Sequence, residues 1–264
     1  MKFSKDEKPT VILVPGMWST EDTFKEVQEA FIDQGYATES LSLPYHYSKK
    51  DHTIESKKSL SQTRLQDYVA FIVEQVKRQE TPPILVGHSM GGLLIQLVAA
   101  QVPCQSLILL SSAPPATVNG VSISAIRTFG MNLLRLPLWK SITEVKLKHV
   151  RYGLANSQND TFQQEIYSNT TYESGMATFQ IIMGHWLRKK SSSYVKVQNI
   201  HCPVLVIGGT EDRITPIKIQ RSIAKNFGDR AQLLEVDGCC HWTIGGKYFP
   251  TVRAEIFNWL EKEL

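Results

Sequence analysis

The residues best suited to chemistry lie in the pentapeptide Gly87-His88-Ser89-Met90-Gly91. An apolar run, residues 83–86, precedes it, and a helix-like stretch, residues 93–100, follows it. A G-x-S-x-G sequence between a strand and a helix is typical of a nucleophile elbow, a sharp turn that presents the serine hydroxyl at the edge of a sheet. Ser89 is therefore a candidate nucleophile for attack on a substrate carbonyl. The alternative is a chance occurrence of the pattern in a loop.

The rest of the chain must supply the elements that position this turn. Short apolar runs alternate with helical patterns, which is typical of a parallel sheet built from β-α-β units. Strands are expected at Val11–Val14, Ala37–Leu43, Pro83–Gly87, Ser106–Leu110, Val204–Gly208 and Ala231–Val236. Helices are expected between an N-cap at Ser19 or Thr20 and Gly35, from about Gln62 to Gln79, and from about Tyr248 to Glu263. We therefore expect an α/β fold with a mostly parallel sheet of about six strands, flanked by helices.

One segment, residues 116–200, interrupts the alternation, because it has helix-like patterns but no convincing strand. An insertion of about 85 residues is too long for a bare loop. We expect it to form a helical cap or lid subdomain, inserted after the fourth strand. The core domain would then comprise residues 1–115 and 201–264.

These features resemble the α/β-hydrolase fold superfamily, and in particular its serine hydrolase branch of carboxylesterases and lipases. In that family a helical cap occurs at the position of segment 116–200, and the elbow follows a central strand. The resemblance implies that the six strands correspond to the third to eighth strands of the family's sheet, since only ten residues precede Val11. The serine argues against the haloalkane dehalogenase and epoxide hydrolase branches, which use an aspartate at this place.

A serine is a poor nucleophile unless a base removes its proton and a third group orients that base. In the family the acid and the histidine follow the serine in that chain order. Asp212, in the loop after the strand at 204–208, resembles the family's acid, with its neighbour Glu211 as the alternative. His241 matches the family's G-x-x-H turn after the last strand. Asp237 could also serve as the acid, but it lies away from the expected place.

An oxyanion hole needs two backbone N–H groups aimed at the developing charge. The resemblance places one at Met90, directly after the nucleophile, and the other at Met17, in the loop after the first strand. Many family members have His-Gly in this loop, whereas this chain has Pro15-Gly16. The donor is a main-chain group, so the change of side chain does not remove it.

Four other histidines lie in or near candidate site segments. His88 adjoins the nucleophile, but its position in the turn directs it away from the reacting side, so we interpret it as structural. His46 and His52 lie in a polar loop after the second strand, which either lines the entrance or is simply solvated. His185 in the insert is expected to pack rather than bind a ligand.

Composition excludes several classes of protein. The 264 residues, 42% of them hydrophobic, suffice for the core of one α/β domain. The net charge is +4, and residues 116–200 hold ten basic against four acidic side chains. This basic insert could favour an anionic substrate or a membrane surface, or it could be a solvated helical surface. No basic stripe with interleaved aromatic residues is present, so nucleic acid binding is not expected.

Neither a metal nor an organic cofactor is expected. The four cysteines do not form a disulfide framework and fit reduced thiols in a cytoplasmic protein. Cys239 and Cys240 lie beside His241, but no second ligand pair has zinc spacing, so they are interpreted as packing residues. No apolar run reaches the roughly 18 residues of a membrane span, and no signal peptide is recognised. The sequence carries no signal for the oligomeric state.

The combined prediction is a serine hydrolase that cleaves an ester-type bond of a small hydrophobic substrate through an acyl-enzyme. Candidate substrate contacts are Trp18, Met131, Trp139, Met183, Trp186 and Trp242, although the residues in the insert could equally form its own core. A thioesterase, a lactonase or a C–C hydrolase would use the same three residues. A non-catalytic ligand-binding or receptor protein and a cofactor-free dioxygenase are alternatives on the same fold.

Overall fold

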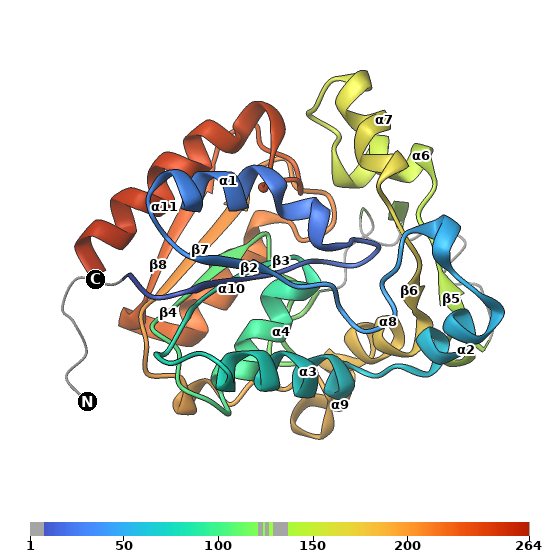
Figure 1. The fold of residues 1–264 in the computed structure, drawn as a ribbon, viewed down its shortest axis with the longest axis horizontal. Coiled ribbons are helices and arrows are strands. Elements are labelled where there is room, and N and C mark those ends of the chain that lie inside the picture. Colours follow the sequence, from blue (N-terminus) through green and yellow to red (C-terminus); the bar gives the residue numbers. More distant parts are fainter. Residues whose placement is uncertain (1–7, 121–123, 125–126, 129–136, 264) are drawn as a thin grey trace.

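A sheet of six parallel strands forms the centre of the molecule (Figure 1). The computed structural model describes residues 8–120, 124, 127, 128 and 137–263. The strands are β1 (Val11–Val14), β2 (Thr38–Ser40), β3 (Ile84–His88), β4 (Ser106–Leu110), β7 (Val204–Gly209) and β8 (Ala231–Val236), in the spatial order β2-β1-β3-β4-β7-β8. The predicted α/β class and the six predicted strands are confirmed.

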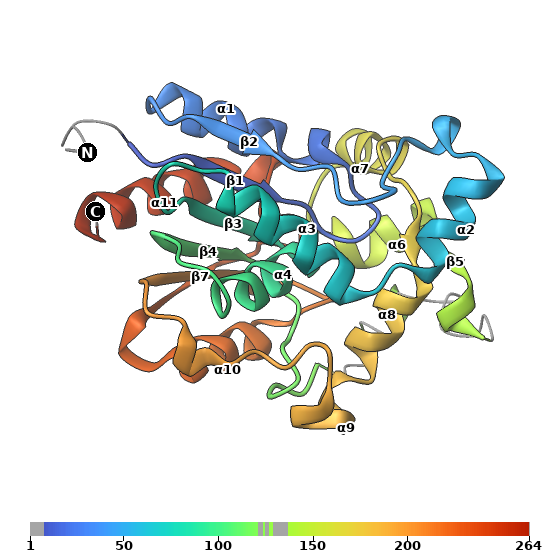
Figure 2. The ribbon, with the colours of Figure 1, turned by 60° about the horizontal axis from the view of Figure 1, so that its bottom comes forward.

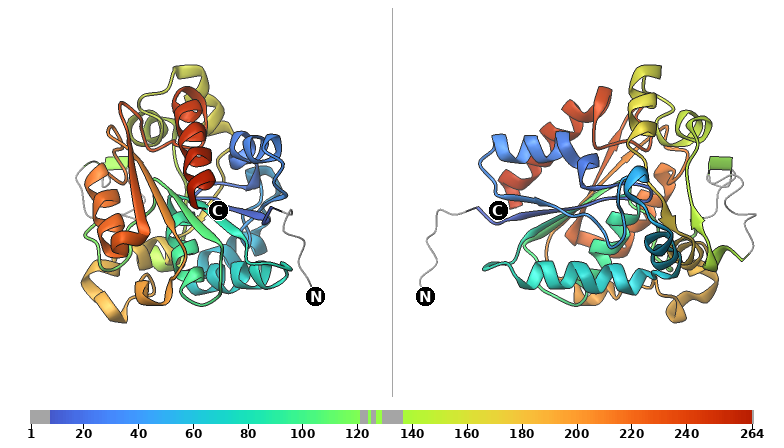
Figure 3. Two further views of the ribbon diagram at one scale, coloured as in Figure 1. Left: turned by 90° about the vertical axis from the view of Figure 1, so that its left-hand side faces the viewer. Right: turned by 45° about the vertical axis from the view of Figure 1, so that its right-hand side comes forward.

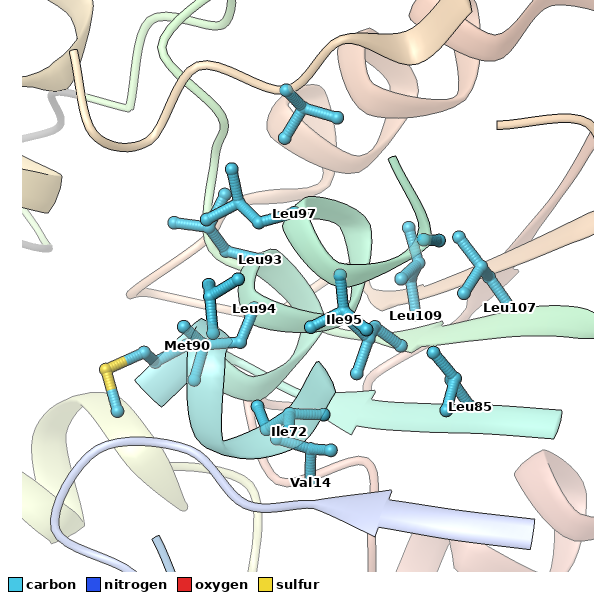
Figure 4. Close-up of a cluster of buried hydrophobic side chains, with 14 of the residues drawn as sticks. Val14, Ile72, Leu85, Met90, Leu93, Leu94, Ile95, Leu97, Leu107 and Leu109 are labelled. Atoms are coloured by element: carbon cyan, nitrogen blue, oxygen red, sulfur yellow. The ribbon is translucent and has the colours of Figure 1, made fainter. Parts of the chain in front are cut away.

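The four central strands β1, β3, β4 and β7 are buried on both faces, which explains why they are largely apolar runs rather than alternating ones. Successive residues of β1 contribute to two different hydrophobic clusters, Ile12 and Val14 to one and Val11 and Leu13 to the other. Figure 4 shows the first cluster, in which α4 packs its leucines and isoleucine onto the sheet. The strands therefore separate two cores, each covered by its own helices.

The helices lie in two layers, one on each face (Figures 2 and 3). One layer holds α1 and α11, and the other holds α3, α4 and α10. These helices are α1 (Lys25–Asp33), α3 (Leu65–Lys77), α4 (Met90–Ala99), α10 (Ile217–Phe227) and α11 (Phe249–Glu263). A further helix, α2 (Ile54–Gln62), belongs to neither layer. Single-turn helical segments are η1 (Glu21–Phe24), η2 (Lys49–Asp51), η4 (Leu138–Lys140), η5 (Val150–Leu154), η6 (Arg188–Lys190), η7 (Val197–Asn199), η8 (Gly228–Arg230) and η9 (Gly246–Tyr248).

The helix predicted over residues 62–79 is α3, but a separate helix, α2, precedes it and was missed. The α2 helix begins at a capping box in which the Thr53 side chain accepts from the Ser56 backbone N–H. Only Leu60 and Ser61 of α2 are buried. An amphipathic pattern is the main signal for a helix in sequence, and α2 carries little of one.

The insert lies beyond the carboxyl ends of the strands (Figure 1). Besides the single-turn segments η4 to η7, it contains β5 (Ile142–Thr143), α6 (Leu147–His149), α7 (Asp160–Ser168), β6 (Glu173–Ser174), α8 (Gly175–Ile182) and α9 (Gly184–Leu187). Strands β5 and β6 pair antiparallel, which corrects the expectation of a segment without strands. Strands of two residues are too short to show an alternating pattern in the sequence.

The strand order has a topological switch point at β1 and β3. From β1 the chain passes to β2 on one side and then returns to β3 on the other side of β1. The loops after β1 and β3 therefore diverge, and ligands of open α/β sheets bind at such a switch point, outside the carboxyl ends of the strands. The insert covers this same edge.

Candidate active site

Ser89 occupies a one-residue turn between β3 and α4. Its backbone is left-handed, with φ of 53°, a strained conformation for any residue other than glycine. A Cβ at Gly87 would lie 2.5 Å from the carbonyl carbon of Gly91, and a Cβ at Gly91 would collide with the carbonyl oxygen of Val14. Both glycines of the motif are therefore needed to bring α4 against the strands. The turn leaves Ser89 partly exposed between buried neighbours.

Asp212 and His241 meet at the same edge of the sheet. They follow β7 and β8, and Nδ1 of His241 lies 2.8 Å from Oδ2 of Asp212. A carboxylate accepts, so Nδ1 carries a proton, and Nε2 is the ring nitrogen left for another partner. The alternative acids do not make this contact: Glu211 is exposed, and the carboxylate of Asp237 accepts from the Thr210 hydroxyl.

The environment of Asp212 keeps it ionised. The Oδ1 atom accepts from the backbone N–H groups of Ile214 and Thr215 at 2.8 and 2.9 Å, and Oδ2 accepts from the Thr215 hydroxyl at 2.8 Å. Burial by itself raises the pKa of Asp212, but the charge and hydrogen bond of His241, with the backbone donors, hold it below its ordinary value. Thr215 was not singled out in the sequence. Its place three residues after the acid, next to the N-cap proline of α10, was the available signal.

His88 connects the elbow to the histidine turn. Its Nε2 lies 2.9 Å from the carbonyl oxygen of His241, which can only accept, so Nε2 is the protonated nitrogen. Burial, and then the neighbouring His241, lower the pKa of His88 to about 3. His88 is thus a neutral donor, and its hydrogen bond ties the main chain of His241 to the turn that carries Ser89. This confirms the structural interpretation of His88.

The loop after β1 lies directly against the elbow. A Cβ at Gly16 would be 3.0 Å from the Cβ of Ser89, so glycine permits this approach. Met17 follows in the loop and is partly buried. Met90 is the first residue of α4, where a backbone N–H has no acceptor within the helix and the helix dipole is positive. The two predicted oxyanion donors therefore belong to segments that pack against each other at Ser89.

A buried ionic cluster, not expected from the sequence, holds this loop to the insert. Nδ1 of His46 lies 3.0 Å from the carbonyl oxygen of Ser19, and Nε2 lies 3.2 Å from the Tyr68 hydroxyl and 3.3 Å from Oε2 of Glu173. The Tyr68 hydroxyl donates to Oε1 of Glu173 at 2.7 Å, so toward His46 it can only accept. Both ring nitrogens of His46 therefore carry protons, and the ring is a cation paired with Glu173.

This cluster corrects the interpretation of His46 as part of a solvated loop. His46 is 1% exposed and Glu173, in β6 of the insert, is fully buried. Burial by itself lowers the pKa of His46, but the Glu173 carboxylate more than offsets this and raises it overall. In the loop after β1, Trp18 donates its indole N–H to Thr143 of β5 at 3.1 Å. The insert thus fixes the segment that carries Met17.

Replacing Glu173 by glutamine is expected to destabilise the fold by about 3 kcal/mol at pH 6, because it leaves a buried imidazolium without its counter-charge. A raised His46 pKa stabilises the fold fully below the ordinary histidine pKa of about 6.5, and this contribution is lost as the pH rises through the folded value. The difference in the free energy of unfolding between the wild type and Glu173→Gln should therefore narrow toward pH 9. Urea unfolding at both pH values measures it, with the exposed Glu29→Gln as control. If the two proteins were equally stable, or if their difference in stability were the same at both pH values, the ion pair would be contradicted.

Two of the predicted substrate contacts lie in the core, next to site residues. Trp18 follows Met17 and is 3% exposed, with a left-handed backbone. Trp242 follows His241, and its ring packs edge-on against that of His88, with centroids 5.8 Å apart. Both indoles are therefore mostly covered by neighbouring side chains.

The predicted contacts in the insert are more scattered. The ring of Trp139 packs on Phe179 with centroids 5.2 Å apart and remains partly exposed. Met183 is partly buried after α8, whereas Trp186 in α9 is 58% exposed and faces solvent. Met131 lies outside the described residues. Trp139 and Trp186 are therefore both solvent-exposed to a substantial degree rather than enclosed in a core.

In the part of the chain that the structure describes, His, Cys, Asp and Glu side chains form no group of three that could hold a metal ion. Among the same residues, no helix has the length and hydropathy required to cross a bilayer.

Comparisons with known proteins agree with this architecture. A family profile described as the alpha/beta hydrolase family matches residues 11–245. No curated protein sequence shows significant similarity. Solved structures that resemble the chain include a monoacylglycerol lipase from Paleococcus ferrophilus (18% identity, 98% of this chain and 97% of that one, TM-score 0.72) and a methylesterase from Arabidopsis (13%, 96% and 99%, 0.70). A third is a pyrethroid hydrolase from Sphingobium faniae (18%, 96% and 97%, 0.67). At these identities the likeness is one of fold.

Proposed function

The chain belongs to the alpha/beta hydrolase family, and we propose that it is a serine hydrolase that cleaves carboxylic esters of small hydrophobic substrates. One observation carries the proposal: a buried Asp212–His241 pair lies at the sheet edge where a strained turn holds out Ser89. A serine, a base with a free Nε2 and an acid that fixes the tautomer are the three parts that acyl transfer requires.

In the first step, His241 Nε2 takes the proton of the Ser89 hydroxyl while Oγ attacks the ester carbonyl carbon. The imidazolium that forms is stabilised by the ionised Asp212, which accepts from Nδ1 throughout. The tetrahedral intermediate collapses when Nε2 gives its proton to the leaving alcohol. The acyl group then remains on Ser89.

In the second step, water enters and His241 acts as base again. The hydroxide adds to the acyl carbonyl, and the collapse of the second intermediate returns the proton to Ser89 and releases the acid. In both steps the backbone N–H groups of Met17 and Met90 donate to the oxyanion. Loss of one such donor typically costs about 10²–10³-fold in rate.

Residues 116–200 act in this proposal as a cap that covers the site and selects the substrate. The cap supplies Thr143 and Glu173, which hold the loop of Met17, so it also helps to order the oxyanion hole. The choice of an ester is supported by the three structural neighbours, which are a lipase, a methylesterase and a pyrethroid hydrolase. The choice of a hydrophobic substrate rests on the apolar side chains of the cap.

The proposal is tested with p-nitrophenyl esters of increasing acyl length, from acetate to decanoate. We expect saturable hydrolysis with an optimum at one chain length, because a covered site accepts acyl groups only up to the size of its pocket. The matching thioesters serve as a comparison for substrate class. A folded protein that hydrolyses none of these compounds would contradict the proposal.

A further inference from the structure

Two cysteines meet at the edge of the sheet opposite to the proposed catalytic site. Cys104 precedes β4 and Cys202 precedes β7, and these strands are neighbours in the sheet. Their Sγ atoms are 3.4 Å apart, although the residues are 98 positions apart in the chain. A disulfide bond is about 2.05 Å long, so a side-chain movement of about 1.4 Å would bring the sulfurs to bonding distance.

Cys104 and Cys202 both line a surface pocket of about 290 Å³. The pocket is lined by Ala99, Ala100, Gln101, Val102, Pro103, Cys104, Asn199, His201 and Cys202. Both cysteines are partly buried rather than enclosed. Small oxidants can therefore reach these sulfurs, whereas Cys239 and Cys240 are fully buried in the second hydrophobic cluster.

The two thiols are not equivalent. The hydrogen bond with Cys104 lowers the pKa of Cys202, against the effect of burial, and the positive charge of Arg230 lowers it further. Arg230 is held nearby, because its guanidinium donates to the carbonyl oxygen of Val197 at 3.3 Å. The same hydrogen bond raises the pKa of Cys104. The positive charge of Arg230 favours a thiolate at Cys202, so Cys202 is the better nucleophile of the pair.

We propose that Cys104 and Cys202 are a redox modification site that closes to a disulfide when the protein meets a peroxide. The Cys202 thiolate attacks one oxygen of hydrogen peroxide, the O–O bond breaks, and Cys202 becomes a sulfenic acid while the released hydroxide takes a proton to give water. Sγ of Cys104 then attacks the Cys202 sulfur. The S–O bond breaks, and the thiol proton of Cys104 leaves with the hydroxyl group as a second water. Two thiols lose two electrons and two protons, and the peroxide is reduced to two waters.

The disulfide would join the starts of β4 and β7 and enclose β4 and the whole of the insert in one covalent loop. Cross-linking a loop of this length restricts the unfolded chain strongly, so the oxidised protein should be the more stable form. The pair lies at the amino ends of the strands, whereas Ser89, Asp212 and His241 follow their carboxyl ends. The inference therefore does not depend on the proposed hydrolase activity.

The test is to treat the full-length protein with a small excess of hydrogen peroxide and to count free thiols after denaturation. We expect the count to fall from four to two, with peptide mass spectrometry locating one intramolecular link between Cys104 and Cys202. The Tm should rise by about 5 °C or more and return on reduction with dithiothreitol. Cys104→Ser should leave a Cys202 sulfenic acid that dimedone traps. Cys239→Ser, the matched control at a buried thiol, should still form the link between Cys104 and Cys202. Its Tm should rise on oxidation relative to its own reduced form.

Other results would overturn the inference. A wild-type protein that keeps four thiols after peroxide has no such site. A link that involves Cys239 or Cys240, or one between two protein molecules, would assign the chemistry elsewhere. A Cys202 that passes to the sulfinic acid without forming the link would show that Cys104 does not resolve it.

Discussion

Replacing Ser89 by alanine is expected to abolish ester hydrolysis, with kcat reduced by about 10⁴-fold or more. The substitution removes the Oγ that would form the acyl-enzyme. The turn itself should persist, because its hydrogen bonds are made by the backbone: the N–H of Ser89 donates to Leu110, and its carbonyl accepts from Ala113. Alanine also tolerates the left-handed backbone no worse than serine does.

The measurement is kcat and KM with the best p-nitrophenyl ester, alongside the Tm of each protein. Ser222→Ala, an exposed serine on α10, is the matched control and should retain full activity. A Ser89→Ala protein that keeps more than about one hundredth of the activity would remove Ser89 from its proposed role.

Replacing Asp212 by asparagine is expected to reduce kcat by about 10³–10⁴-fold with little change in KM. Oδ1 of Asp212 accepts two backbone N–H groups, so an asparagine would keep its oxygen there and turn its NH₂ group toward His241. Nδ1 of His241 would then have to accept. Its proton would move to Nε2, which could no longer take the proton of Ser89.

The alternative acids supply the controls. Glu211→Gln and Asp237→Asn change exposed carboxylates near the same loops and should leave kcat within about twofold, since exposed charges interact weakly with the site. The account of the acid would be wrong if either control lost as much activity as Asp212→Asn. It would also be wrong if Asp212→Asn were fully active.

The parts of the site that the sequence predicted are those that local patterns determine. The pentapeptide around Ser89, together with the strand before it, is enough to predict the elbow. The structure shows why each of its glycines is required. The meeting of Asp212 with His241 was also predictable, because each follows a strand and the carboxyl ends of parallel strands share one edge. The assignment of their catalytic roles remains a proposal.

What the sequence did not reveal depends on residues far apart in the chain. The ion pair of His46 with Glu173 joins the loop after β2 to the insert, and neither residue has a local pattern that distinguishes it from a solvated side chain. The pair of Cys104 and Cys202 arises only because β4 and β7 are neighbours. Thr215 was overlooked because a threonine near a helix start is usually only a cap.

The most direct test of the central claim is to label the folded protein with a fluorophosphonate and to locate the adduct by peptide mass spectrometry. This reagent reacts with a serine only when a base and an oxyanion hole activate it. We expect one adduct, on the peptide that contains Ser89, and no labelling of the heat-denatured protein or of Ser89→Ala. A folded protein that is not labelled, or one labelled at another serine, would contradict the assignment of Ser89 as the nucleophile.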